Sequence, residues 1–100
     1  MLNNPSFLSF YKIKNQNNGF VVSITGNSRL ESIDFNYKTG NPFVCVGTIS
    51  GDTNILQWVN IGSGGTINQV LININSTTTF YVSISGGTVD VCFSYRNNFW

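Results

Sequence analysis

Few side chains in this chain of 100 residues could carry chemistry. Histidine is absent, which removes the commonest general base and the commonest metal ligand. The carboxylates are Glu31, Asp34, Asp52 and Asp90, and a glycosidase would need two carboxyl groups about 5–10 Å apart. Glu31 and Asp34 lie at an odd spacing on one predicted strand, so we expect them to face opposite sides of a sheet. Asp52 is typical of a turn, and the sequence predicts no catalytic residue and no enzyme.

The two cysteines, Cys45 and Cys92, each lie inside an apolar segment. Without histidine they cannot complete a four-ligand zinc site, so no metal or other cofactor is predicted. Their spacing around Trp58 resembles that of an immunoglobulin domain, but Asp90 stands where the tyrosine of such a domain is expected. Two separate buried thiols are the favoured interpretation, because free cysteine is among the most buried residue types, and a disulfide is the alternative.

Aromatic side chains are the remaining candidates for binding. Sugar rings stack on exposed aromatic faces, and the candidates for such a surface are Trp58, Tyr11, Tyr37, Tyr81 and Tyr95. Packing in the core or in an interface is the simpler explanation for these side chains.

The last two residues, Phe99 and Trp100, are large apolar rings at a position that normally frays into water. We expect them to dock on the parent domain or on a neighbouring subunit. They are the predicted interface residues.

The elements that must position these residues are strands. Apolar and polar residues alternate with period two, and turn residues interrupt them every 8–12 residues, as in an all-β sandwich or barrel. We predict one antiparallel β-sandwich domain over residues 1–100, jelly-roll-like or immunoglobulin-like, with residues 1–5 and 96–100 as terminal arms. The eight predicted strands are 6–14, 20–25, 30–37, 43–49, 54–61, 66–75, 79–85 and 88–95.

The pair Gly86-Gly87 predicts a two-residue hairpin of type I′, in which both central residues need positive φ. That register would place three apolar pairs on one face. The pairs are Ile84 with Val89, Val82 with Val91, and Phe80 with Phe93.

Charged residues make up only 9% of the chain, against about 25% in a typical soluble domain. The 15 Asn, 11 Ser and 9 Thr take their place. A net charge of +1 without a basic cluster argues against nucleic acid and against an anionic membrane as partners. The N-terminus lacks the basic and apolar regions of a signal peptide, so we expect synthesis in a cytoplasm without export by that route.

A surface so poor in charge is weakly protected against association, which suits a subunit fixed in an assembly. In this respect, and in stretches such as Thr79-Phe80-Tyr81-Val82-Ser83-Ile84-Ser85-Gly86-Gly87-Thr88, the chain resembles small β-sandwich structural proteins of bacteriophage particles. The resemblance implies a minor capsid, vertex, decoration or tail component that is located in the virion, associates with itself and docks to other virion proteins. The alternative is a carbohydrate-binding β-sandwich module of a secreted or surface protein, with a glycan as its partner.

Overall fold

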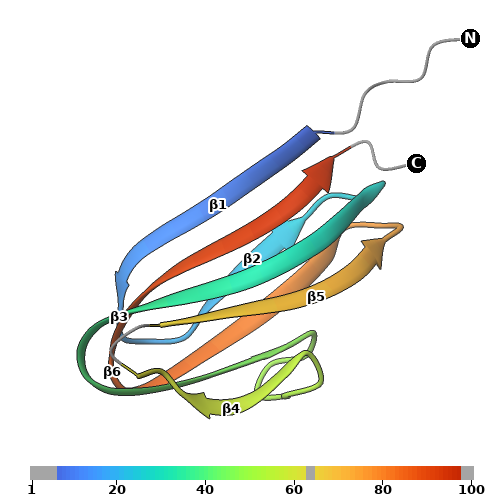
Figure 1. The fold of residues 1–100 in the computed structure, drawn as a ribbon. Coiled ribbons are helices and arrows are strands. Elements are labelled where there is room, and N and C mark those ends of the chain that lie inside the picture. The colour runs from blue at the N-terminus through green and yellow to red at the C-terminus, as the bar shows by residue number, and fades with distance from the viewer. Residues whose placement is uncertain (1–6, 63–64, 98–100) are drawn as a thin grey trace, which may run out of the picture.

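The computed structural model describes residues 7–62 and 65–97. Every regular element in these ranges is a strand, and the strands form one open antiparallel sheet (Figure 1). The strands are β1 (Phe7–Gln16), β2 (Phe20–Ile24), β3 (Ser28–Gly47), β4 (Leu56–Asn60), β5 (Thr66–Ile74) and β6 (Thr78–Asn97). The all-β class is confirmed, whereas the two separate sheets of the predicted sandwich are not.

The long strands β3 and β6 form the centre of the sheet and pair with each other along most of their length. β1 and β2 pair with β6 on the side away from β3. β4 and β5 pair with the other edge of β3. Each long strand therefore carries two shorter strands, one on each side of its midpoint.

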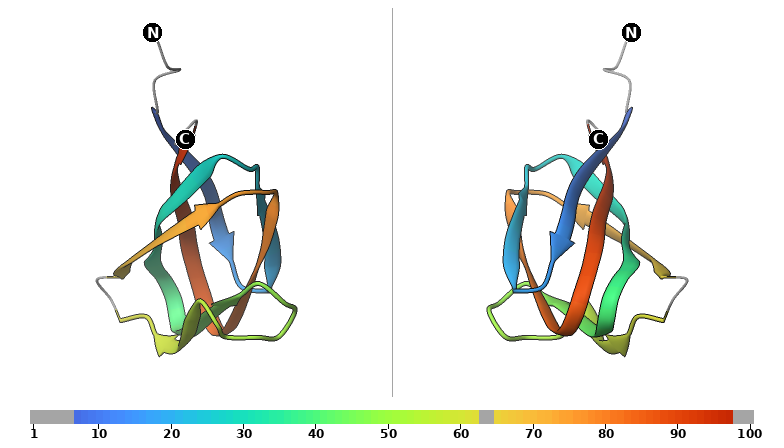
Figure 2. Two further views of the ribbon diagram at one scale, coloured as in Figure 1. Left: turned by 90° about the vertical axis from the view of Figure 1, so that its right-hand side faces the viewer. Right: turned by 90° about the vertical axis from the view of Figure 1, so that its left-hand side faces the viewer.

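Both long strands fold back on themselves near their midpoints. Phe80 and Phe93 are 13 residues apart on β6 and would lie ~43 Å apart in a straight strand, yet their ring centroids are 6.1 Å apart. Gly40 and Gly86 have positive φ at the two bends. Figures 1 and 2 show the two parts of the sheet turned toward one another, with the core between them.

The bends divide the sheet into two halves. The β1 half consists of β1, β5, residues 28–39 of β3 and residues 88–97 of β6. The β2 half consists of β2, β4, residues 43–47 of β3 and residues 78–85 of β6.

The predicted hairpin at Gly86-Gly87 is wrong. β6 bends at this pair, but its two arms do not pair with each other. Ile84 pairs with Val44 of β3 rather than with Val89. A type I′ turn needs positive φ at both positions, and only Gly86 has it. The apolar face was predicted correctly, because alternation fixes which side chains share a face whichever strand is the partner.

The core lies between the two halves. Its fully buried large side chains come from both, and they are Phe35, Phe80, Phe93, Leu30, Ile33, Ile61, Ile74, Val44, Val46, Val82, Val89 and Val91. Period-two alternation on the predicted strands 30–37 and 66–75 also places apolar side chains in the core. The residues concerned are buried or packed against it, and they are Ile33, Phe35, Tyr37, Val70, Ile72 and Ile74.

The eight predicted strands correspond closely to the observed segments, because β3 covers two of them and β6 covers two more. Arg96 and Asn97, predicted to begin a terminal arm, are the last residues of β6 and pair with Leu8 and Phe7. Residues 1–5 and 98–100, including Phe99 and Trp100, lie outside the described residues.

Candidate interaction surfaces

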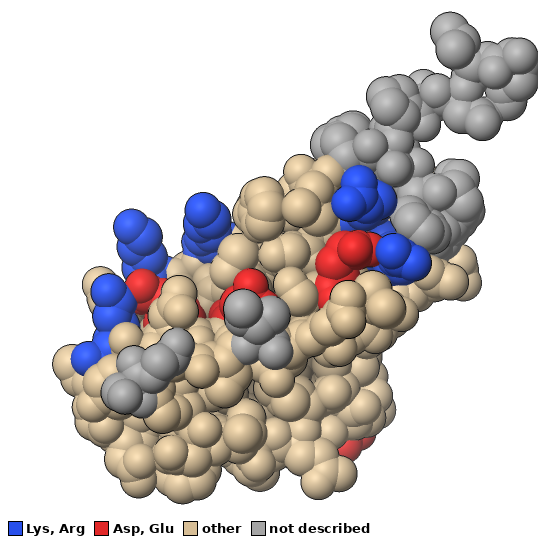
Figure 3. Space-filling view, in the orientation of Figure 1, with Lys and Arg blue, Asp and Glu red and all other residues tan. Residues whose placement is uncertain are grey.

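Charge is concentrated in one half of the molecule. Of the five basic and four acidic residues, all except Asp52 belong to the β1 half. They are Lys12, Lys14, Arg29, Glu31, Asp34, Lys38, Asp90 and Arg96. Figure 3 shows these charges gathered over the strands of the β1 half. The strands of the β2 half contain no charged residue.

The odd spacing of Glu31 and Asp34 does not put them on opposite faces, so that prediction is wrong. The register of β3 shifts between Leu30 and Ser32, a β-bulge that inserts one extra residue. Leu30 and Ile33 both remain in the core, so the two carboxylates share the outer face. Glu31 is 2.6 Å from Nε of Arg29, which gives it a structural partner instead of a second carboxylate.

Two other carboxylates hold the chain in place. Asp90 lies 3.3 Å from Nζ of Lys38 and accepts a hydrogen bond of 2.8 Å from the backbone N–H of Asn15, which has positive φ. Asp52 accepts a hydrogen bond of 2.8 Å from the backbone N–H of Thr53, which confirms its predicted turn role. These contacts give both acids a structural role.

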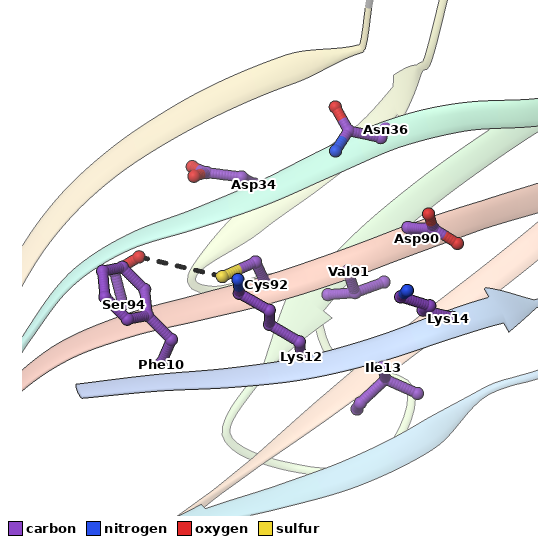
Figure 4. Close-up of a pocket in the computed structure, with 10 residues that line it drawn as sticks. All are labelled: Phe10, Lys12, Ile13, Lys14, Asp34, Asn36, Asp90, Val91, Cys92 and Ser94. Atoms are coloured by element: carbon purple, nitrogen blue, oxygen red, sulfur yellow. Dashed lines mark hydrogen bonds between the residues drawn. The ribbon is translucent and has the colours of Figure 1, made fainter.

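An open groove of about 480 Å³ crosses the outer face of the β1 half (Figure 4). Lys12 and Lys14 of β1 form one wall, Asp34 and Asn36 of β3 the other, and β6 forms the floor with Cys92 and neighbouring residues. Nζ of Lys12 lies 5.6 Å from the centroid of the Phe10 ring. The groove mixes both signs of charge and has the Cys92 thiol on its floor.

Asp34 is the partly buried carboxylate of the groove wall. Burial raises its pKa above the ordinary value, and hydrogen bonds from the Ser32 side chain and the Asn68 backbone act in the opposite direction. Its Oδ1 atom is buried without a hydrogen-bond partner among the described residues. Partial removal from water disfavours the ionised form, which explains the direction of the shift.

Replacing Asp34 tests whether burying its ionised carboxylate destabilises the fold. Because the folded-state pKa lies above the unfolded value, ionised Asp34 destabilises the fold above the folded pKa, and this effect disappears below the unfolded value of about 3.8. Asp34→Asn is therefore expected to unfold at a higher temperature than the wild type at pH 7, with the gap closing toward pH 3. Thermal unfolding at both pH values measures the gap, and a gap of equal size at both would contradict this explanation.

The β2 half has an uncharged outer face with exposed apolar side chains. Val21, Trp58 and Phe43 are 55%, 51% and 39% exposed, and hydroxyl groups lie between them. Ser23 and Thr79 share a hydrogen bond of 2.9 Å. Phe43 and Trp58 line one hollow, whereas Val21 lies on the opposite edge strand of this half.

The loop between β3 and β4, residues 48–55, folds back beside this face. Ser50 and Gly51 line a shallow hollow together with Val21 and Tyr81. Asn54 closes the loop, since its Oδ1 accepts from the backbone N–H of Thr48 at 2.9 Å and its Nδ2 donates to the Thr48 hydroxyl at 3.0 Å.

A second shallow hollow, of about 260 Å³, is lined by Phe43, Trp58 and Ser85. Phe43 lies between Ser85 of β6 and Asn60 of β4 in the strand register. Nδ2 of Asn60 donates to Oδ1 of Asn41 at 2.8 Å. Two exposed aromatic rings therefore lie beside hydrogen-bonding amides.

The aromatic residues singled out in the sequence separate into two groups. Trp58 and Tyr11 are exposed, whereas Tyr37 and Tyr95 pack against the core and Tyr81 is half-buried. The exposed aromatics do not form one surface, because Tyr11 lies on β1 and Trp58 on β4.

Sequence reasoning missed Phe10 and Phe43, both exposed. The position of Phe43 immediately before the core residue Val44 was a usable signal, because neighbouring strand residues face opposite sides. For Phe10 the sequence contains no comparable signal, because β1 is an edge strand on which either face can be exposed to solvent.

Cys45 and Cys92 are both free, so the favoured interpretation of two separate thiols is confirmed. Cys45 is 1% exposed, whereas Cys92 is half-buried rather than fully buried. Trp58 is exposed and does not cover a disulfide as it would in an immunoglobulin domain.

A thiol count checks this assignment. Two thiols are expected to react with Ellman's reagent in denaturant without reductant, whereas Cys45 in the folded protein is expected to be protected by its burial. The Cys45→Ser variant serves as the control that identifies the protected thiol. A count below two in denaturant would contradict the free-cysteine assignment.

Within residues 7–62 and 65–97 no cluster of three or more metal-ligating side chains occurs. The same ranges contain no helix that could cross a membrane. The arrangement offers surfaces for binding: a mixed-charge groove on one half and an uncharged apolar face on the other. Comparison with known proteins found no matching family model, no matching curated protein and no matching solved structure.

Proposed function

We propose that this protein is a non-enzymatic structural subunit of a virus particle, specifically of a bacteriophage. It acts by associating with copies of itself and with other virion proteins. Its place in the particle is that of a minor capsid, vertex, decoration or tail component.

The observation that carries this proposal is the uncharged outer face of the β2 half. Val21, Phe43 and Trp58 are exposed there on strands that carry no charge, so burying these side chains against a neighbour removes apolar surface from water. The loop between β3 and β4 brings one charge, Asp52, beside Gly47 of β3. Depletion of charge with enrichment of aromatic residues is the composition of an interface centre. The β1 half carries the charge that keeps the other side of the subunit in water.

The order of the strands supports the proposal. With β3 and β6 each counted as two segments, the six strands become eight, in the order 1-8-3-6 in the β1 half and 2-7-4-5 in the β2 half. This is the arrangement of a jelly roll, an architecture found in viral capsid proteins and in lectins. We therefore take the fold to be a small jelly roll whose two layers remain joined through the bent strands.

A pair of variants tests the role of the uncharged face. Trp58→Lys puts a charge inside the proposed contact and is expected to raise the dissociation constant of self-association about tenfold or more. Leu71→Lys makes the same change at a comparably exposed apolar residue of β5, in the other half, and is expected to leave association unchanged. Sedimentation velocity over a range of concentrations measures both, and equal effects of the two variants would refute the assignment of the face.

The virion role itself is tested by gene neighbourhood. Capsid or tail genes adjacent to this gene are expected. Adjacent genes for secreted glycan-degrading enzymes would instead favour the second candidate.

The second candidate function is glycan binding, and the hollow at Phe43 and Trp58 is the observation that favours it. The rings could stack on a sugar ring while the amides of Asn60 and Asn41 and the hydroxyl of Ser85 hydrogen-bond to its hydroxyl groups. On a glycan array this function predicts binding that Trp58→Ala abolishes and that Tyr11→Ala, a matched aromatic truncation on β1, leaves intact. Absence of binding to any glycan would count against it.

A further inference from the structure

β1 is an edge strand whose outer edge is open. It pairs with β6 on one side, and no strand of the described ranges pairs with its other side. Such an edge presents unpaired backbone N–H and C=O groups that can accept another strand.

The other edges of the sheet are protected in ways that β1 is not. β2 and β4 have only five residues each, and β5 is interrupted by a bulge beside Leu71, which has positive φ. Short strands and bulges are common means of preventing edge pairing. β1 has ten residues, and its register with β6 is regular from Phe7 to Ile13.

The side chains along this edge are apolar at one end and basic at the other. On the outer face of β1, Leu8 and Phe10 are followed by Lys12 and Lys14. Leu8 and Phe10 are 43% and 55% exposed. In an antiparallel pair of two identical strands, each apolar side chain can therefore lie opposite a lysine of the other copy.

We propose that β1 pairs with β1 of a second copy in an antiparallel register centred on Tyr11. In this register Phe10 lies opposite Lys12, Leu8 lies opposite Lys14, and Tyr11 faces its own symmetry mate. Centring on Lys12 or Ile13 would put lysines directly opposite one another, which is destabilising. Centring on Phe10 also avoids that repulsion, but it aligns seven residues of the ten-residue strand, from Phe7 to Ile13, whereas centring on Tyr11 aligns nine, from Phe7 to Asn15. Charge and length together select Tyr11.

The contact has the symmetry of a closed dimer. A two-fold axis perpendicular to the sheet at Tyr11 relates the copies, so the same patch is used on both. Lys12 already lies over the ring of Phe10 within one chain at 5.6 Å, which shows that the two side chains tolerate each other's approach. The inference rests on the proposed self-association but uses the opposite half of the sheet from the uncharged face.

A reciprocal swap tests the pairing and its register. Phe10→Lys places lysine opposite Lys12 of the other copy and is expected to raise the dimer dissociation constant at least about tenfold. Phe10→Lys/Lys12→Phe restores a lysine opposite a phenylalanine only in the register centred on Tyr11, and is expected to bring the constant back to within about threefold of wild type. Sedimentation velocity of the full chain measures all three proteins.

The outcomes separate this inference from the proposed function. Loss of dimer in Phe10→Lys without rescue by the double variant overturns the register, and no loss in Phe10→Lys overturns β1 pairing. If in either case Trp58→Lys still weakens assembly, the proposed function stands alone. If the swap behaves as expected while Trp58→Lys changes nothing, β1 pairing stands and the uncharged face is not the contact.

Discussion

Gly87→Ala is expected to destabilise the protein by about 3 kcal/mol or more, a large part of the stability of a domain of this size. A Cβ atom at this position would lie 2.4 Å from the backbone oxygen of Thr39 and 2.8 Å from the backbone nitrogen of Pro42. Both atoms belong to the bend of β3, which runs beside the bend of β6. The substitution therefore forces the two central strands apart where they fold back.

Two other glycines provide graded controls for this prediction. A Cβ at Gly62 meets no atom of residues 7–62 and 65–97 within 4 Å, so Gly62→Ala is expected to change stability by less than about 0.5 kcal/mol. Gly51 has open space but a φ of +80°, so Gly51→Ala is expected to cost about 1–2 kcal/mol from backbone strain alone. Urea unfolding of the three variants gives the series. Gly87→Ala behaving like Gly62→Ala would mean that β3 and β6 do not lie against each other at the bends.

Phe80→Ala is expected to cost about 3–5 kcal/mol of unfolding free energy. The side chain is 0% exposed and packs against Phe93 from the other half of the sheet. Its removal leaves a cavity between the halves that the surrounding strands cannot fill without breaking their pairing.

Phe10→Ala is the matched control, because it makes the same truncation at a phenylalanine that is 55% exposed. Measured at a concentration where the chain is monomeric, it is expected to cost less than about 1 kcal/mol. Equal losses in the two variants would show that the core does not lie between the halves.

Most of the strand content was predictable from the sequence, because alternation reports burial directly. Phe80, Val82, Val91 and Phe93 share the core face as the pattern predicts. Which strand lies beside which was not predictable, because two glycines in an alternating run suit either a reversal or a bend. The pairing of β6 with β3 favours the bend over the reversal, and this pairing joins residues that are far apart in the sequence.

The surfaces were less predictable than the strands. The scarcity of charge is visible in the composition, but its concentration on one half follows from how the bends distribute the segments between the halves. The shared face of Glu31 and Asp34 depends on the β-bulge between Leu30 and Ser32, which no local sequence pattern predicts. The exposed edge of β1 likewise emerges only from the strand order.

The proposed function requires that the chain associates with itself through apolar surface. Sedimentation velocity of the full chain across a hundredfold range of concentration, in 0.1 M and in 1 M NaCl, tests it most directly. We expect reversible association that persists or strengthens at high salt, because apolar contacts are not screened. A monomer at every concentration, or association that disappears in 1 M NaCl, would contradict it.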